Sequence, residues 1–142
     1  MINVKNLTKK YGKFTAVEDL SFDINKGEIV GLLGPNGAGK TTTMKIITCF
    51  MPATAGKVKI AGYDVTKQSL KIRKLIGYLP ENAPLYPELN VTEYLRYIAE
   101  VRGIPMLKRK EAIEKVIEQC GLREKRRSEI SELSKGYKQR VG

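Results

Sequence analysis

Apolar residues along the chain change their spacing near residue 90, and this change predicts two kinds of structure. Before it, apolar and polar residues alternate in "LSFDI" (residues 20–24) and "KVKI" (57–60), which is typical of strands with one buried face. Two other segments, "EIVGLLG" (28–34) and "LIGYL" (75–79), are almost continuously apolar. Such runs predict strands that are covered on both faces, so we expect this part of the chain to be rich in β-structure.

The chain after residue 90 has the spacing of helices. "TEYLRYIAEVRG" (92–103) and "LKRKEAIEKVIEQCG" (107–121) each place apolar residues three or four positions apart. Thr92 is the expected N-cap of the first helix, and Gly103 and Gly121 are the expected stops. The residues expected to face inward are Tyr94, Leu95, Ile98 and Val101 in the first helix, and Ile113, Val116, Ile117 and Cys120 in the second.

Composition narrows the classes of protein that fit. The chain has 142 residues, 42% of them hydrophobic and 29% charged, which is typical of one globular domain. No apolar run approaches the ~20 residues that cross a membrane, and the start has no secretory leader, so we expect a cytosolic protein. The two cysteines are expected to be free thiols. The absence of histidine excludes a zinc site with imidazole ligands.

The net charge of +11 favours an anionic ligand or surface. Part of the excess lies between residues 123 and 140, where seven basic residues accompany three acidic ones. A solvated basic surface explains this segment at least as well as a binding patch does. Charge alone therefore does not distinguish nucleotide, nucleic acid and acidic lipid.

A phosphate-binding loop is the strongest motif. "GPNGAGKT" (34–41) matches G-x-x-x-x-G-K-[ST] at every fixed position and precedes an expected helix in "KTTTMKIITCFM" (40–51). The glycines allow backbone N–H groups to surround a phosphate, and the helix directs its positive end to the same anion. Lys40 is expected to contact the β- and γ-phosphates, and the Thr41 hydroxyl to bind Mg²⁺. The predicted ATP-binding residues of this loop are Gly34, Pro35, Asn36, Gly37, Ala38, Gly39, Lys40, Thr41 and Thr42.

The order of motifs resembles the nucleotide-binding domain of ABC-type ATPases. Three segments support the resemblance: residues 9–47 around the loop, "IGYLPENAPLY" (76–86) and "LSKGY" (133–137). The resemblance implies that Tyr11 stacks on adenine, with Val17 nearby, whereas without it a tyrosine packed on a strand edge would be equally reasonable. It also implies that Glu81 occupies the position of a glutamine that senses Mg²⁺ and the attacking water. A carboxylate oxygen can bind Mg²⁺, but it adds negative charge beside the phosphates.

"LSKGY" is similar to the LSGGQ signature of that family. It keeps Ser134 and Gly136, whereas Lys135 and Tyr137 replace the third and fifth residues. The resemblance implies a head-to-tail dimer in which Ser134 and Gly136 of one subunit contact the γ-phosphate held by the other. Considered without the resemblance, the segment would be an ordinary capped helix start.

The implied fold is an α/β P-loop core with an antiparallel β subdomain and a helical subdomain, incomplete at the C-terminus. The expected parts are residues 1–89 (β subdomain and core), 90–132 (helical subdomain) and 133–142 (signature and the start of its helix). The family's Walker B strand and switch histidine have no counterpart here, so we expect the chain to be the first part of the domain. We therefore expect exposed apolar surface, and ATP binding without turnover.

The resemblance implies the ATP-binding subunit of an ABC transporter, in a branch with drug-export, sodium-efflux and gliding-motility ATPases. Its expected partners are ATP with Mg²⁺, a second copy of the subunit, and separate permease subunits at the inner face of the cell membrane. The alternative is a soluble ABC-type ATPase that acts on nucleic acid or the ribosome. No stripe of aromatic and basic residues supports nucleic-acid binding, and only the loop itself supports a third option, a P-loop kinase.

Overall fold

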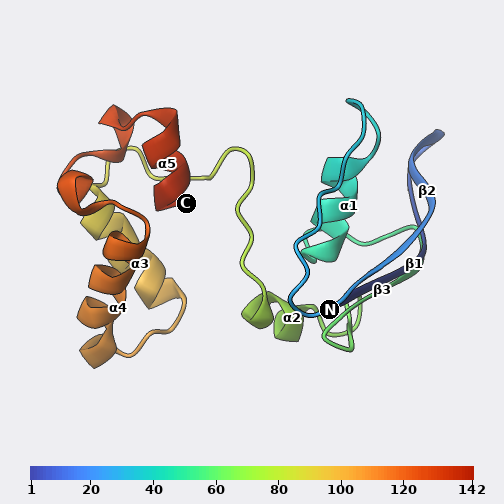
Figure 1. Cartoon of the computed structure of the whole chain (residues 1–142), viewed down its shortest axis with the longest axis horizontal. Helices are drawn as coiled ribbons and strands as arrows, with labels where there is room; N and C mark the ends of the chain where they lie inside the picture. Colours follow the sequence, from blue (N-terminus) through green and yellow to red (C-terminus); the bar gives the residue numbers. More distant parts are fainter. The chain divides into compact units, whose positions relative to one another are not determined.

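The computed structural model describes residues 1–142 and divides them into two units, each with its own hydrophobic core (Figure 1). The first unit, residues 1–78, contains the sheet and the phosphate-binding loop. The second, residues 79–142, is helical and carries the LSKGY segment. The family's α/β combination of an antiparallel sheet with helices is therefore present.

The first unit is built on a four-stranded antiparallel sheet in the order β2-β1-β3-β4. Its elements are β1 (Ile2–Tyr11), β2 (Phe14–Ile24), α1 (Lys40–Ile47), β3 (Ala55–Ile60), β4 (Tyr63–Asp64) and α2 (Ser69–Leu75). Val4 of β1 pairs with Val58 of β3, and both are buried. Helix α1 contacts β2 and β3 and adds Ile46 and Ile47 to the same core. The alternating segments 20–24 and 57–60 form strands as predicted.

The two continuously apolar segments do not form the strands that we predicted from their sequence. Residues 28–34 and 76–80 are irregular, and Leu75 ends helix α2. Ile29 is fully exposed and Leu33 is 91% exposed. A strand is stable only when its backbone groups pair with a neighbour, and the sheet contains no strand next to either segment. The exposed apolar surface that we expected is therefore found at these two segments.

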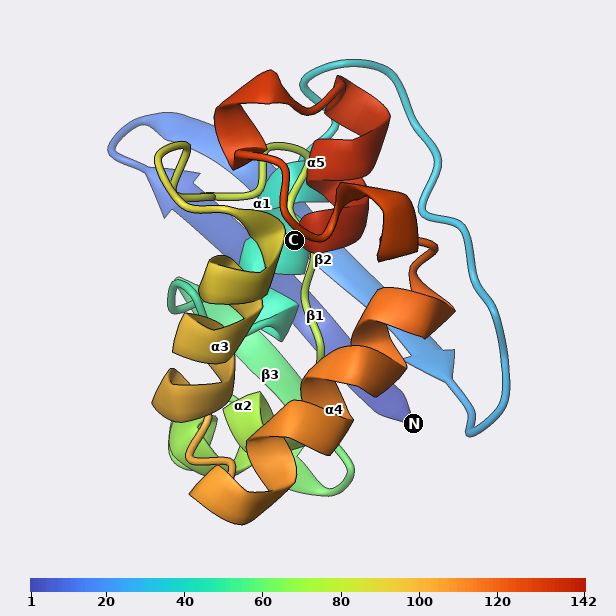
Figure 2. The ribbon, with the colours of Figure 1, turned by 90° about the vertical axis from the view of Figure 1, so that its left-hand side faces the viewer.

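The second unit packs α3 (Val91–Val101) against α4 (Met106–Gln119). Two short 3₁₀ helices, η1 (Arg123–Lys125) and η2 (Ile130–Glu132), lead to α5 (Lys135–Val141). Figure 2 shows the α3–α4 connection at one end of this unit and α5 at the other. The core of the unit gathers residues from all three α-helices and the segments between them: Val91, Tyr94, Ala99, Ile113, Ile117, Leu122, Ile130, Leu133 and Val141.

Several details of the helices differ from the prediction. Asn90, not Thr92, caps α3, because its side chain accepts from the Glu93 N–H while the Glu93 carboxylate accepts from the Asn90 N–H. The Thr92 hydroxyl instead donates to the Arg126 carbonyl at 2.8 Å. Gly103 and Gly121 follow the helix ends with φ of 70° and 62°, as expected of left-handed C-terminal glycines.

Two apolar positions predicted to be buried are exposed. Val116 lies on the outer side of α4, and Val101 ends α3 beyond the core. The spacing of apolar residues shows which face of a helix is buried, but it does not show where along the helix the core ends. For this reason the exposure of Val101 could not be predicted. None of the helices combines the length and the apolar character needed to cross a membrane.

Both cysteines are free thiols, as predicted. Cys49 is buried just after α1, where the Arg73 guanidinium donates to its carbonyl oxygen at 2.5 Å. Burial raises the pKa of the Cys49 thiol, because the low-dielectric surroundings disfavour the thiolate.

Candidate nucleotide-binding site

The phosphate-binding loop is a series of turns that ends at the first residue of α1. Gly37 and Gly39 have φ of 86° and 80°, in the left-handed region that favours glycine. The Ala38 N–H donates to the Pro35 carbonyl at 3.2 Å, which closes one turn of the loop. Gly39 is the N-cap of α1, and no side chain caps the free N–H groups of this helix. These amides are therefore available to an anion.

Lys40 lies across the loop that it follows. Its Nζ donates to the Gly34 carbonyl at 2.6 Å and to the Pro35 carbonyl at 2.8 Å. These bonds hold the ammonium group over the loop with no carboxylate paired to it, since the ion pairs of the chain involve other residues. Carbonyl oxygens carry no net negative charge that would cancel that of the ammonium group, so the group attracts a phosphate.

The loop is fixed against strand β2 by close packing at Gly39. A Cβ at this position would lie 2.3 Å from the Ala16 carbonyl oxygen and 2.8 Å from Cγ2 of Val17. Only glycine fits here, because a backbone carbonyl cannot move aside for a side chain. The structure therefore brings Val17 next to the loop, as a buried packing residue.

Tyr11 lies at the end of the β1–β2 hairpin, paired with Phe14. Tyr11 as a whole residue is 45% exposed, its hydroxyl donates to Sδ of Met51 at 3.2 Å, and Nζ of Lys9 lies 5.3 Å from the ring centre. Lys9 also donates to the Pro52 carbonyl at 2.8 Å. The ring is thus held in place with part of its surface free for stacking. The sequence analysis did not identify the role of Lys9, since a lysine in an alternating strand gives no such signal.

The signature segment forms the start of helix α5. Ser134 is its N-cap, and the Tyr137 N–H donates to Ser134 Oγ at 3.4 Å. Ser134 and Gly136 are both exposed, and a Cβ at Gly136 would meet no atom within 4 Å. The helix start that we predicted is present, and its two signature residues are open to a partner molecule.

Glu81 lies in the segment that contacts the other end of α5. Nε2 of Gln139 donates to the Glu81 backbone carbonyl at 2.8 Å, and the Glu81 side chain is exposed. A Cβ at Gly142 would lie 2.5 Å from Cβ of Ala83, so α5 packs closely on this segment. Helix α5 and the segment that contains Glu81 also border a cavity of about 240 Å³, and Lys135 and Lys138 line it. Sequence reasoning missed Gln139, because nothing in its spacing indicates a backbone partner 58 positions away.

A magnesium site was predicted at Thr41 and Glu81. Thr41 is exposed in the first turn of α1 in the first unit, whereas Glu81 belongs to the second unit. No group of three or more acidic or thiol side chains gathers to hold a metal by itself.

Comparison with known proteins identifies the family. A family model described as ABC transporter matches residues 17–142, which include the loop, Glu81 and the LSKGY segment. The chain belongs to the ABC transporter family. Among the relatives of this ABC family chain, the linearmycin resistance ATP-binding protein LnrL of Bacillus subtilis (strain 168) is 38% identical over 141 residues. That match covers 99% of this chain and 45% of LnrL, so the chain spans less than half the length of this relative.

Two solved structures resemble the ABC family chain closely. The first is described as the ATP-binding subunit of an ABC transporter. It has a TM-score of 0.84 and is 33% identical in sequence. The matched region covers 99% of this chain and 59% of the chain in that structure. The second is a dimeric ATP-binding cassette in a post-hydrolysis state bound to ADP and Pi. It has a TM-score of 0.83 and is 26% identical in sequence. The matched region covers 99% of this chain and 66% of the chain in that structure. The predicted fold class is confirmed by these likenesses.

Proposed function

We propose that the chain binds ATP through the loop at residues 34–42. The observation that carries this proposal is the arrangement of Lys40, whose ammonium group lies over the loop, bonded only to the carbonyls of Gly34 and Pro35. Uncapped amides at the start of α1 add a second attraction for phosphate. The exposed ring of Tyr11 supplies a surface on which adenine stacks, and Val17 supports the loop from β2.

Mg²⁺ is proposed as the second cofactor. The Thr41 hydroxyl is exposed in the first turn of α1, where it can bind a cation that also contacts the phosphates. The Glu81 carboxylate is exposed and acts as the Mg²⁺ and water sensor in place of the family's glutamine. The link from Gln139 to the Glu81 carbonyl then ties this sensor to helix α5 of the same subunit.

The signature residues Ser134 and Gly136 are proposed to act on the nucleotide of a second copy. The start of α5 exposes a hydroxyl and unpaired N–H groups, which suit an anion supplied by another molecule. Support comes from the related cassette that was solved as a dimer with ADP and Pi. In this proposal two copies pack head to tail, and each signature stabilises the γ-phosphate at the other's loop. The segments 1–89, 90–132 and 133–142 remain the predicted functional parts.

The intact protein is proposed to be the ATPase subunit of an export system. It would lie on the cytoplasmic face of the membrane and drive separate permease subunits by cycles of ATP binding and hydrolysis. The relative named for linearmycin resistance supports export of drug-like compounds over the soluble nucleic-acid alternative. Residues 1–142 alone are proposed to bind nucleotide without turning it over.

Drug accumulation in cells tests this function. A host that lacks the intact protein is complemented with the wild type, with Lys40→Ala or with Lys45→Ala, a lysine of the same helix that lies over the Phe50 ring. We expect Lys40→Ala to accumulate a fluorescent drug as the uncomplemented host does, and Lys45→Ala to export it. Normal export by Lys40→Ala at equal expression would refute the proposal. For residues 1–142, steady-state phosphate release at the rate of an intact ATPase would refute the absence of turnover.

A further inference from the structure

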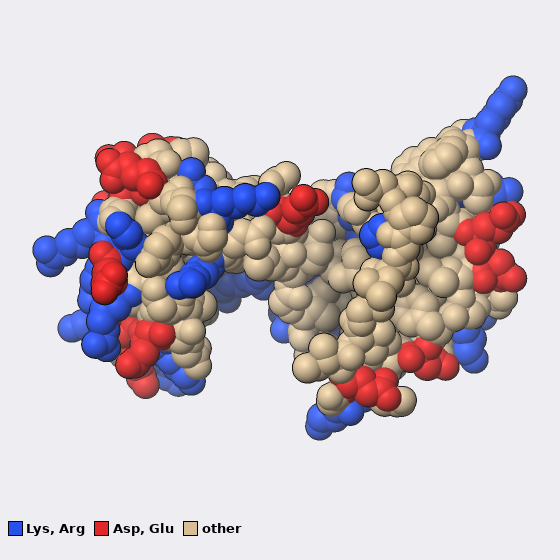
Figure 3. Space-filling model, turned by 45° about the horizontal axis from the view of Figure 1, so that its top comes forward, with Lys and Arg blue, Asp and Glu red and all other residues tan.

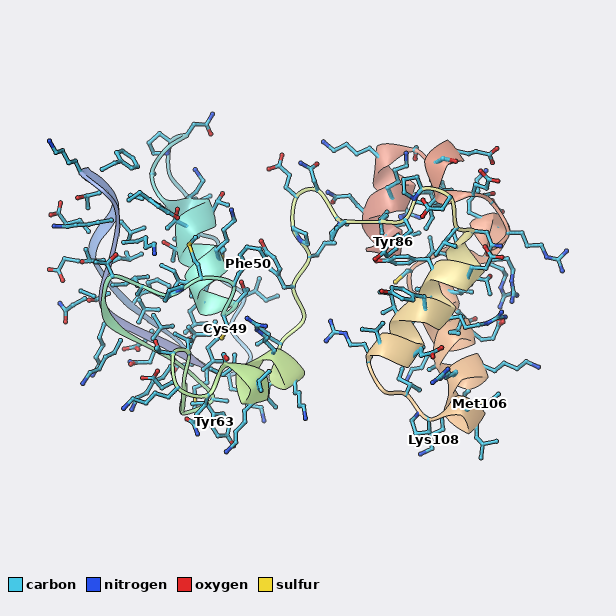
Figure 4. The ribbon with its side chains drawn as sticks, turned by 180° about the vertical axis from the view of Figure 1, so that it is seen from behind. Cys49, Phe50, Tyr63, Tyr86, Met106 and Lys108 are labelled. Carbon is cyan, nitrogen blue, oxygen red and sulfur yellow. The ribbon has the colours of Figure 1, made fainter.

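The connection between α3 and α4 presents apolar side chains to solvent at one end of the helical unit. We define the hairpin tip as residues 101–110. Met106 is 83% exposed, Leu107 is 98% exposed, and Val101, the last residue of α3, is exposed as well. Figure 4 shows Met106 at this end of the unit, away from Tyr86. Single exposed apolar residues are ordinary on protein surfaces, whereas three of them within ten positions of one helix–helix connection call for an explanation.

The same tip carries cations that have no acidic partner. Arg102, Lys108 and Lys110 are exposed, and none of them takes part in the chain's ion pairs. Lys108 projects next to Met106 (Figure 4). Most other basic side chains of the chain also lack an ion pair, and only Arg109, Arg123 and Arg126 are paired with glutamates. Figure 3 shows basic and acidic side chains side by side on one face of this unit. The tip therefore combines apolar side chains with three exposed cations that form no ion pair.

The Arg109 side chain links α4 to the end of α3 and to the connection between the two helices. Nε of Arg109 donates to the Ile104 carbonyl at 2.8 Å, and its Nη1 pairs with the Glu100 carboxylate at 3.1 Å. Gly103 adopts a φ of 70° just after α3, and the turn leads directly to α4. A preformed turn loses little further conformational freedom when its side chains are buried by a partner.

We propose that the hairpin tip docks on an anionic lipid surface, with Met106 and Leu107 among the acyl chains and the three cations at the headgroups. Apolar side chains flanked by lysine and arginine are what a membrane surface with acidic lipids attracts. A stable protein interface needs about 800 Å² from each partner, more than three side chains at the end of a hairpin expose. The contact would orient the helical unit on the membrane, and it does not depend on nucleotide binding.

The chain contains no tryptophan, so one introduced residue reports on one site. We would place tryptophan at Leu107 and, as a matched control, at Leu70. Leu70 is a leucine of α2 that is 74% exposed and stands beside Lys71. Vesicles made of equal parts phosphatidylglycerol and phosphatidylcholine are compared with phosphatidylcholine alone. Circular dichroism checks that each variant folds as the wild type does.

We expect the emission of Leu107→Trp to shift to the blue on the acidic vesicles only, and that of Leu70→Trp to stay unchanged on both. Added salt should reverse the shift, because the attraction is screened. In the Leu107→Trp background, the double substitution Lys108→Glu with Lys110→Glu should weaken binding to the acidic vesicles at least twenty-five-fold. Each cation near an acidic membrane contributes about five-fold to the affinity, and two are lost. The matched pair Lys57→Glu with Lys59→Glu, on exposed positions of β3, changes the net charge equally and should have a much smaller effect.

Three outcomes would overturn the proposal. One is the absence of a shift at position 107 on acidic vesicles. Another is an equal shift on both kinds of vesicle, or at position 70 as well, because it would show unselective adsorption by the exposed apolar segments. The third is a shift that requires vesicles carrying membrane proteins, which would assign the tip to a protein partner rather than to lipid.

Discussion

Alanine at Gly39 should destabilise the first unit far more than alanine at Gly37, although both glycines have φ near 80–86°. Both substitutions put a side chain on a backbone in the left-handed region, and each therefore loses about 1–2 kcal/mol of stability from this cause. Gly37 has no atom within 4 Å of an added Cβ. At Gly39 the added Cβ would lie 2.3 Å from the Ala16 carbonyl oxygen, so α1 or β2 must move. Overpacking of this kind costs about 1–3 kcal/mol more.

Urea unfolding followed by circular dichroism measures the difference. We expect Gly37→Ala to lower the free energy of unfolding by about 1–2 kcal/mol and Gly39→Ala by about 2–5 kcal/mol, from these two contributions. The slope with urea should be equal in the two variants, so that the midpoints report stability. If both variants unfold at the same midpoint, Gly39 does not pack on β2 and the described support of the loop is wrong.

Three further predictions concern the surroundings of the loop, the sensor segment and the buried thiol. Tyr11→Ala should weaken ATP binding by about 1–3 kcal/mol whereas Tyr11→Phe should not, and equal calorimetric affinities for the two would contradict stacking. Gln139→Leu removes the bond to the Glu81 carbonyl, so amide hydrogen exchange in α5 should quicken, and unchanged rates would show that the bond does not hold the helix. Because burial raises the pKa of the Cys49 thiol, its contribution to stability is complete below the ordinary thiol pKa and falls as the pH rises above it. Cys49→Ala should therefore lose less stability than the wild type between neutral and alkaline pH, and parallel losses measured by urea unfolding would refute this.

Local signals in the sequence were sufficient for the phosphate-binding loop, the helix that follows it, the alternating strands and two helix ends. The loop and α1 follow from glycines that need positive φ and from a helix start directly after them, and both are present. The strands at residues 20–24 and 57–60 follow from the alternation of apolar and polar residues. Gly103 and Gly121 end their helices as expected, because left-handed glycine is a local requirement.

The failed predictions depend on neighbours that lie far away in sequence. Residues 28–34 have the composition of a buried strand, but pairing requires a partner strand, and the sheet of this chain does not supply one beside them. Val101 has the correct helical spacing, yet the core ends before it, so it belongs to the hairpin tip. The bond between Gln139 and Glu81 joins two segments whose approach is set by the packing of α5.

Calorimetric titration of the folded protein with ATP and Mg²⁺ tests the central claim most directly, namely that the loop at Lys40 binds a triphosphate. We predict saturable binding by the wild type and by Lys45→Ala. For Lys40→Ala we predict affinity about ten- to a hundred-fold lower, since a hydrogen bond to a charged group contributes about 1.5–3 kcal/mol. Absence of binding by the folded wild type, or equal affinity for Lys40→Ala, would contradict the account.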